Sequence, residues 1–389
     1  MMYHNTKHPV LVWSAAMLLA CALGSIHAFS VLLVPLETTF DIPRSQASLV
    51  YSLALVTLAA CVLLGPRFYP RWSAAVFVMG VGLIASVGCL LAGTASSMVV
   101  VYLGYSLLFG GANGLGYGFA LQLPAQAMPE HKGLAMGAVT AAYALGAILF
   151  PLLLVWASGT GGWRMACTLL AVAVLLLALV SALLLSRASA HYQTDETNVS
   201  VQTNISGSVL SIWWLAYCSA VIAGLMVIGH ATGIADASGM SPRWVVLAPT
   251  LIALFNLVGS VSGGVLADKF SARVPLIALP ALSCGSLIVM ALLLQPVVAM
   301  AGLAIIGFTY GGVIAIYPAL IAKRFGSMQG AVVYGRVFTA WAVAGLAGPG
   351  LAGLLFDRSG NYTLALGFAA VMAAVSVIFG HRASSLRLV

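Results

Sequence analysis

The sequence predicts an all-α membrane protein whose twelve transmembrane helices form two parallel-related six-helix halves. Three observations predict this fold class. First, 62% of the 389 residues are hydrophobic and only 6% are charged, whereas soluble domains carry roughly 25% charged residues. Second, the apolar residues fall into twelve runs, each close to the length of about 20 residues that crosses a bilayer. Third, motifs of the first half recur in the second half at a nearly constant offset.

The positions of these runs define the expected helices and domains. A polar stretch at 188–208 separates the first six runs from the last six, and we interpret it as a cytoplasmic linker. An N-terminal six-helix half then covers residues 1–187, and a C-terminal half covers residues 209–389. The twelve runs lie near 10–36, 46–65, 73–93, 98–123, 133–157, 163–187, 209–236, 243–267, 274–294, 297–322, 331–356 and 361–381.

Lys and Arg residues in the loops set the orientation of a membrane protein. If both termini are cytoplasmic, only four of the 16 basic residues fall outside, namely Arg44, Arg164, Arg243 and Arg358. We therefore expect a multi-pass protein of the plasma membrane, the inner membrane of a bacterium, with both termini in the cytoplasm. The net charge of +8 then reflects topology, and the scattered cations form no basic face for a nucleic acid.

An internal repeat supports the division into two halves. Gly65 is matched by Gly264 at an offset of 199 residues, and residues 137–144 are matched by residues 335–342 at an offset of 198. Parallel repeats of this kind place a substrate site between the halves, near the middle of the bilayer.

Small residues at every fourth position predict close helix packing, or a surface on which helices slide. They occur in three runs, as Gly110, Gly114 and Gly118, as Gly307 and Gly311, and as Ser260 and Gly264.

Several kinds of chemistry find no support in the sequence. The six cysteines lie in predicted spans without the spacing of a metal site or a disulfide framework. No phosphate-binding loop of the G-x-x-x-x-G-K-[ST] type is present. We therefore expect no metal, no cofactor and no ATP-driven step. An enzyme is not expected either, because no nucleophile–base pair or metal cluster falls in a predicted cavity.

The loop after the eighth run carries the most specific motif. It reads Gly264-Val-Leu-Ala-Asp268-Lys-Phe-Ser-Ala-Arg273 and resembles the G-x-x-x-D-x-x-x-x-R loop of the major facilitator superfamily. The resemblance extends over essentially the whole chain. It implies the major facilitator fold, transport by alternating access, and a conformational latch in which Asp268 and Arg273 hold the halves together on the cytoplasmic side. In the first half, Tyr69 stands in the place of the acid.

Within the superfamily, the chain most resembles the oxalate/formate antiporter and monocarboxylate-porter group. The stretches that carry this resemblance surround His27 and His230 and include residues 334–341. The resemblance implies a carrier of small organic anions. Oxalate carriers have an arginine in helix 8 and a lysine in helix 11, where this chain has Ser260 and Trp341. Since an unpaired charge in the bilayer is costly, oxalate is excluded, whereas a monoanion or a neutral molecule is not.

Candidate ionisable groups are few. No Asp or Glu lies in the central part of a predicted span, so proton coupling would need a histidine or the substrate itself to carry the proton. His27 lies near the middle of the first run and His230 toward the outer part of the seventh, and imidazole can change charge near neutral pH. Either histidine could instead stay neutral and form a hydrogen bond between helices. Arg336 either extends to the headgroups or binds a carboxylate.

Aromatic polar residues complete the candidate site. The resemblance places His27, Tyr117, Tyr143 and Tyr310 in the central cavity of the group, and Trp341 matches Tyr143 in the internal repeat. Asn256 is a weaker candidate, because hydrogen bonding between helices explains it equally well. Tyr69, Tyr192 and Tyr362 lie near membrane ends, where tyrosine is typically an interface anchor. The predicted substrate-binding residues are His27, Tyr117, Tyr143, His230, Asn256, Tyr310, Arg336 and Trp341.

These observations predict a monomeric secondary active transporter that binds a small, singly charged organic anion within the lipid bilayer. The cargo would be a monocarboxylate that moves by exchange or together with a proton. Two alternatives remain open. The lack of central charges and the presence of Trp341 also fit an exporter of a lipophilic compound or drug. A transporter-shaped sensor or regulatory membrane protein that moves nothing is the second alternative.

Overall fold

The protein is described from a computed structural model, which describes residues 8–193 and 206–385. The predicted cytoplasmic termini and residues 194–205 of the predicted linker lie outside the described residues. All regular elements in the described ranges are helices. They form two compact units, and the short segment 136–141 groups with the second unit although its flanking residues belong to the first.

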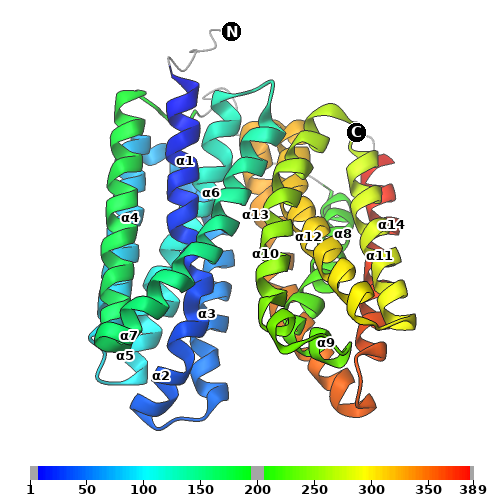
Figure 1. Cartoon of the computed structure of the whole chain (residues 1–389). Helices are drawn as coiled ribbons and strands as arrows, with labels where there is room; N and C mark the ends of the chain where they lie inside the picture. The colour runs from blue at the N-terminus through cyan, green and yellow to red at the C-terminus, as the bar shows by residue number, and fades with distance from the viewer. Residues whose placement is uncertain (1–7, 194–205, 386–389) are drawn as a thin grey trace. The chain divides into compact units, whose positions relative to one another are not determined.

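The first unit contains the helices that precede the linker. In Figure 1, α1 is a long helix drawn in dark blue. Within this unit α6 packs against α1, α3 and α4. The elements are α1 (Pro9–Gly24), η1 (Ser25–Phe29), α2 (Ser30–Phe40), α3 (Arg44–Leu64), η2 (Gly65–Arg67), η3 (Tyr69–Arg71), α4 (Ala74–Gly93), α5 (Met98–Val101), η4 (Tyr102–Phe109), α6 (Gly110–Ala127) and α7 (Lys132–Arg187).

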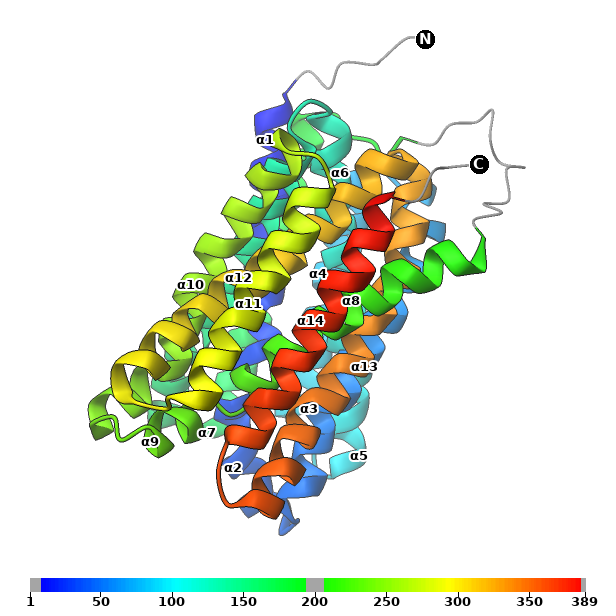
Figure 2. The ribbon, with the colours of Figure 1, turned by 90° about the vertical axis from the view of Figure 1, so that its right-hand side faces the viewer.

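The second unit contains the helices that follow the linker. Figure 2 shows α10, α11, α12 and α14 of this unit running alongside one another. Helix α10 packs against α12, α11 packs against α14, and α8 packs against both α13 and α14. The elements are α8 (Gly207–Ile228), α9 (Ala231–Ala237), α10 (Pro242–Lys269), α11 (Arg273–Leu292), α12 (Pro296–Phe325), α13 (Ser327–Ser359) and α14 (Thr363–Ser385).

The predicted fold class is confirmed. Eleven helices in the described ranges are long and apolar enough to cross a membrane. One of them, α7, has 56 residues and is interrupted at Gly161 and Gly162, so it accounts for the fifth and sixth predicted runs. Gly162 has a φ of 75° and a ψ of 178°, a backbone conformation open essentially to glycine alone.

The seventh predicted run differs from the structure in one respect. A single helix was expected over 209–236, but α8 ends at Ile228 and α9 begins at Ala231. Gly229 and His230 separate the two helices. The apolar pattern could not reveal this break, because the hydropathy of the run is continuous through it.

Large apolar side chains cover the outer surfaces of the helices. Leu152, Val246 and Leu292 are 67%, 74% and 76% exposed. Water-soluble monomers rarely expose apolar side chains over wide contiguous areas. This exposure suits helices that are surrounded by lipid.

The predicted glycine packing is confirmed in the first unit. A methyl group added at Gly110 would lie 2.7 Å from the Ala54 carbonyl oxygen. One turn further along α6, a methyl group at Gly114 would collide with the Leu58 backbone. The absence of side chains at these positions therefore lets α6 and α3 approach until their backbones touch.

The second unit repeats this arrangement with α12 and α10. A methyl group at Gly307 would lie 3.0 Å from the Cα atom of Ile252, and one at Gly311 would collide with the Asn256 backbone. The fourth and tenth membrane helices thus use their glycines in the same way. This likeness gives the internal sequence repeat a physical meaning.

We expect the Gly114→Val substitution to destabilise the protein by about 1–3 kcal/mol, the usual cost of overpacking, because the new side chain meets the Leu58 backbone. Gly80→Val is the matched control, since a methyl group at Gly80 in α4 would meet no atom within 4 Å. Thermal unfolding of both variants in detergent measures the difference. Equal melting temperatures would contradict the packing argument.

Candidate functional site

A group of polar aromatic side chains in the first unit surrounds His27, and we call it the His27 cluster. It comprises His27, Tyr51, Tyr117 and Tyr143, together with Asn113. The Nδ1 atom of His27 lies 2.6 Å from the Tyr51 hydroxyl oxygen. The Tyr143 ring meets the His27 ring edge-on at 5.5 Å between centroids, and the Tyr117 ring lies 4.8 Å from that of Tyr143. Three residues predicted from the sequence are therefore neighbours.

The His27 cluster forms where the first membrane helix changes its geometry. His27 lies in η1, a 3₁₀ segment between α1 and α2. Such a segment disturbs the regular backbone hydrogen bonding of a helix, and in lipid the disturbed groups must find partners inside the protein. Asn113 donates its amide to the Leu23 carbonyl, and the Tyr105 hydroxyl donates to the Ile26 carbonyl at 3.0 Å.

The side chain of Asn113 connects this backbone to Tyr143. Asn113 is fully buried, and its Oδ1 atom accepts a hydrogen bond of 3.0 Å from the Tyr143 hydroxyl. Because the amide group of Asn113 is thus used at both ends, it fixes the position of the Tyr143 ring next to His27.

Helix α3 carries Tyr51 and is held against the π-helical segment η4 by two hydrogen bonds. The Tyr102 hydroxyl donates to the Gln46 carbonyl at 2.8 Å, and the Ser106 hydroxyl donates to the Val50 carbonyl at 2.7 Å. The second bond ends one residue before Tyr51. Sequence reasoning missed Tyr51, because nothing in the spacing of a single sequence pairs it with His27.

A second group, the Trp341 cluster, lies in the second unit and comprises Tyr310, Phe338 and Trp341. The Trp341 indole N–H donates to the Tyr310 hydroxyl at 2.9 Å. Phe338 stacks on Trp341 with 5.4 Å between ring centroids and 10° between planes. Gly224 of α8 leaves room for the Tyr310 ring, since a methyl group there would lie 2.5 Å from it.

The two clusters share one hydrogen-bond arrangement. In the first unit an aromatic residue of α7, Tyr143, donates to a polar side chain of α6. In the second unit an aromatic residue of α13, Trp341, donates to a polar side chain of α12. Tyr143 and Trp341 occupy matching positions of the internal repeat, so the repeat extends to a hydrogen bond as well as to packing.

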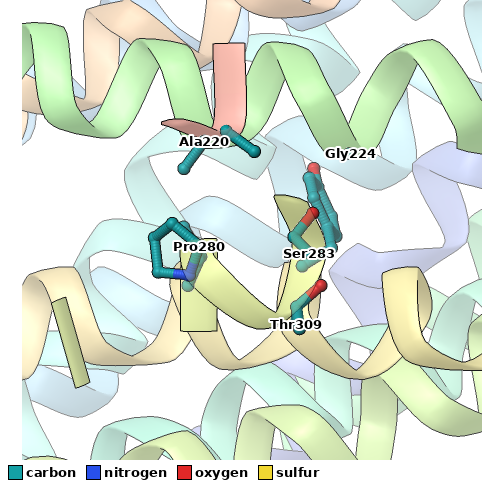
Figure 3. Close-up of a pocket in the computed structure, with 8 residues that line it drawn as sticks. Ala220, Gly224, Pro280, Ser283 and Thr309 are labelled. Carbon is teal, nitrogen blue, oxygen red and sulfur yellow. The ribbon is translucent and has the colours of Figure 1, made fainter. Parts of the chain in front are cut away.

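A small cavity adjoins the Tyr310 side chain inside the second unit. It is lined by residues of α8, α11, α12 and α14. Figure 3 shows Ala220, Gly224, Pro280, Ser283 and Thr309 around this space. The cavity has room for about one water molecule, so it is too small to hold an organic anion.

His230 uses both of its ring nitrogens in contacts within the second unit. A carbonyl oxygen can only accept, so the Nε2–H group of a neutral ring donates to the Pro349 carbonyl at 3.0 Å. Nδ1 then accepts from the Tyr362 hydroxyl at 3.3 Å. Burial raises the pKa of Tyr362, which keeps this phenol a donor. His230 therefore bonds the α8–α9 break to α13, and a contact with substrate stays a prediction.

Asn256 and Arg336 have different surroundings. Asn256 is half-buried on α10, and its Oδ1 atom lies 3.3 Å from the Ser260 hydroxyl. Ser260 lies equally close to the Gly311 carbonyl of α12. Arg336 is exposed on α13, a position from which a guanidinium group can reach either headgroups or an anion. Roles in binding stay predictions for both residues.

The predicted latch residues lie at the α10–α11 corner. Gly264 is buried in α10, Asp268 is half-buried near its end, and Arg273 is exposed as the first residue of α11. Lys323 of α12 reaches this corner and donates to the Ala267 carbonyl at 3.2 Å and to the Asp268 carbonyl at 3.4 Å. A cation at the C-terminus of a helix is favourable, and no motif in the chain predicted this contact. The latch itself stays a prediction.

The expectation that Tyr69, Tyr192 and Tyr362 are membrane-interface anchors is wrong. Their side chains are only 1%, 8% and 7% exposed. The Tyr69 ring meets the rings of Phe77, Phe119 and Tyr192 at 5.2–5.4 Å.

Tyr69 thus replaces the acid of the first-half motif with a buried aromatic cluster. Burial raises the pKa of Tyr69, so the phenol stays neutral. Its hydroxyl group has no hydrogen-bond partner among the described residues. An ion pair at this position of the first half is therefore excluded.

The helical units and their uncharged polar clusters define a class of protein, the multi-pass α-helical membrane transporters. A family model described as Major Facilitator Superfamily matches residues 12–349. The chain belongs to this superfamily.

Sequence relatives agree with this assignment. The chain is 26% identical to the MFS-type transporter YhjX of Escherichia coli K12, over 88% of this chain and 87% of the relative. It is 26% identical to monocarboxylate transporter 13 of Rattus norvegicus, over 93% and 87%. It is 23% identical to the oxalate:formate antiporter of Oxalobacter formigenes, over 89% and 84%.

Solved structures show the same fold. The transporter FucP in its outward conformation matches with a TM-score of 0.71 at 16% identity, over 98% of this chain and all of that chain. The proton:xylose symporter XylE matches with a TM-score of 0.70 at 15% identity, over 97% and 96%. At these identities the likeness concerns the fold alone.

We expect Tyr69→Phe to stabilise the protein by up to about 1 kcal/mol, because it removes a buried hydroxyl group without a partner. Tyr105→Phe is the matched control: its hydroxyl is bonded to the Ile26 carbonyl, and its loss should cost about 0.5–1.5 kcal/mol. Thermal unfolding in detergent compares the two. A lower melting temperature for Tyr69→Phe would show that its hydroxyl is bonded in the folded protein.

Proposed function

We propose that this transporter is a secondary active carrier of a small monocarboxylate. It works by alternating access in the plasma membrane, the inner membrane of a bacterial cell, with both termini in the cytoplasm. Transport occurs by exchange or together with a proton. The observation that carries this proposal is the presence of uncharged polar aromatic clusters on the first, second, fourth, fifth, tenth and eleventh membrane helices, where a transporter of this superfamily needs groups that recognise its cargo.

The chemistry of these clusters favours a singly charged substrate. Hydroxyl, imidazole and indole groups donate hydrogen bonds to a carboxylate, and the aromatic rings accept a short apolar tail. Neither cluster contains Lys or Arg. A dianion such as oxalate would enter the bilayer without two counter-charges, each a substantial penalty. Ser260 and Trp341 stand where oxalate carriers have cations.

The relatives point in the same direction. Two of them are named as a monocarboxylate transporter and as an oxalate:formate antiporter. Formate is the singly charged partner in that exchange. For this chain we infer a monocarboxylate as the substrate. We exclude oxalate, because Ser260 and Trp341 stand where oxalate carriers have an arginine and a lysine.

We assign the following roles. The His27 and Trp341 clusters bind the substrate, with His27, Tyr117, Tyr143, Tyr310 and Trp341 as contacts. Arg336 attracts the anion when the cytoplasmic side is open, and Asn256 and His230 shape the site from within the second unit. Gly264, Asp268 and Arg273 form the latch on the cytoplasmic side.

One observation favours a second function. Phe338 and Trp341 stack face to face, and this flat apolar surface suits a lipophilic compound. Export of such a compound is therefore the alternative. It differs from the first proposal in a measurable way, because its cargo needs no carboxylate.

Uptake of labelled pyruvate, lactate, formate and oxalate into proteoliposomes tests the proposal. We expect saturable uptake of the three monoanions and none of oxalate. Arg336→Ala should lower uptake at low substrate concentration roughly tenfold, which corresponds to about 1.4 kcal/mol of binding.

Arg358→Ala is the matched control, since Arg358 is also exposed on α13 but near its opposite end. It should leave uptake unchanged. If folded protein moves no monoanion but expels a lipophilic dye, export becomes the function. If it moves neither, a sensor or regulatory role takes first place.

A further inference from the structure

We propose that His27 is the group that couples the substrate to a proton, and that its Nε2 atom holds both the proton and the carboxylate. This inference rests on the proposed function and adds to it the coupling ion and the atom that carries it. Tyr51 acts as the positioning residue for the imidazole ring.

The two nitrogens of His27 have different surroundings. Nδ1 lies 2.6 Å from the Tyr51 hydroxyl oxygen, so one side of the ring is anchored to α3. Nε2 makes no hydrogen bond with any part of the chain that the structure describes. The side chain is half-buried, which leaves this nitrogen within reach of water or a small ligand.

Several neighbouring side chains fix the orientation of the His27 ring. Tyr51 and Tyr143 meet the His27 ring edge-on at 6.1 and 5.5 Å between centroids. Tyr143 is fixed by its bond to Asn113, and η1 itself is fixed by the bond from Tyr105 to the Ile26 carbonyl. The imidazole is therefore held with Nδ1 against the Tyr51 hydroxyl, while Nε2 is left without a hydrogen bond in the described part of the chain.

The charged groups of the first unit lie far from His27 along the chain. The titratable groups that contact its ring are Tyr51 from α3 and Tyr143 from α7, both phenols. The next charged residue on its own helix is Glu37, about 15 Å away at a rise of 1.5 Å per residue. From residue 98 to residue 127, the stretch that forms α5, η4 and α6, the sequence has no Asp, Glu, Lys or Arg.

This arrangement couples the proton to the anion. The sequence has no Asp, Glu, Lys or Arg between Lys7 and Glu37. An imidazolium ion at His27 therefore has no carboxylate on its own membrane helix to offset its charge, and a carboxylate bound there has no cation on that helix. Each charge alone is costly in the membrane, whereas the pair is neutral. A bound carboxylate therefore favours protonation, and by linkage a bound proton favours the carboxylate to the same degree.

In each transport cycle, the His27 ring takes up one proton and later releases it. Nδ1–H donates to the Tyr51 oxygen, and Nε2 takes one proton from water on the side where protons are more abundant. The new Nε2–H group then donates to the substrate carboxylate, and the cation and anion form an ion pair. On the other side the carboxylate leaves and Nε2 returns its proton to water. The net cargo is one proton and one monocarboxylate.

Two assays in proteoliposomes separate this coupling from transport itself. Exchange of labelled for unlabelled pyruvate on both sides requires no net movement of protons. Net uptake driven by an inward proton gradient does require it, and a pH dye trapped inside reports the proton. For the unaltered protein we expect both activities, with an acid signal that appears only when pyruvate enters.

The His27→Gln variant keeps a side chain that can hydrogen-bond but cannot carry the proton. We expect the affinity for pyruvate to fall, because the amide cannot offset the carboxylate charge. Exchange at saturating pyruvate should persist, while gradient-driven uptake and the dye signal fall at least about tenfold relative to exchange. His131→Gln is the matched control, because it makes the same replacement at an exposed histidine just before α7, outside the His27 and Trp341 clusters. It should keep both the dye signal and the ratio of net uptake to exchange.

A second variant covers the case in which His27→Gln does not fold, as judged by size-exclusion chromatography. Tyr51→Phe removes the acceptor for Nδ1–H and should move the half-maximal pH of net uptake to a more acid value, with about fivefold less uptake near neutral pH. Exchange at saturating pyruvate should change little.

The outcomes are distinct. If the unaltered protein exchanges and accumulates pyruvate and His27→Gln does the same with a full dye signal, the coupling role of His27 is overturned and the proposed function stands. An unchanged pH profile in Tyr51→Phe would overturn the role of the Nδ1 contact. If the unaltered protein carries no monocarboxylate in either assay, the proposed function fails and this inference fails with it.

Discussion

The structure depends on one constraint: inside lipid, every backbone polar group needs a partner within the protein. Regular helices satisfy this requirement themselves, so interruptions of a helix decide where polar side chains must lie. At η1, Asn113 and Tyr105 bond to the carbonyls of Leu23 and Ile26. At the α8–α9 break, His230 bonds to a carbonyl of α13. Polar groups therefore gather at the interruptions, and it is there that a membrane transporter can recognise a polar cargo.

Glycine positions set the second level of organisation. Gly110 and Gly114 bring α6 against α3, and Gly307 and Gly311 bring α12 against α10. The fourth and second membrane helices of the first unit, and the matching tenth and eighth of the second, therefore touch through their backbones. The aromatic residues that donate to α6 and α12 are Tyr143 and Trp341. They occupy matching positions of the internal repeat. Packing and hydrogen bonding thus follow the same internal duplication, which explains why weak sequence matches at an offset of about half the chain were informative.

Hydropathy and small-residue spacing predicted the helices and their close contacts, because both depend on properties of single helices. Only the family resemblance, and neither hydropathy nor spacing, predicted that His27 and Tyr143 are neighbours. They could not predict the bond between His27 and Tyr51, since it depends on how two helices are rotated about their axes. Burial of Tyr69 was also beyond reach: tyrosine near a membrane end suits an interface anchor and a buried cluster equally well, and only the packing of Phe77 and Phe119 decides between them.

The missing cations are the most informative departure from the oxalate carriers. Replacing two fixed positive charges by Ser260 and Trp341 removes the electrostatic attraction for a dianion and also removes the cost of keeping those charges in an empty site. A monoanion can still be neutralised if one proton enters with it, and a neutral histidine provides that proton acceptor without a permanent charge. The proposed monocarboxylate cargo and its proposed dependence on a proton would therefore both follow from these two replacements. Within the second unit, the Trp341 cluster offers stacked apolar rings and a hydroxyl group held by an indole N–H, groups that suit the uncharged site of the proposal.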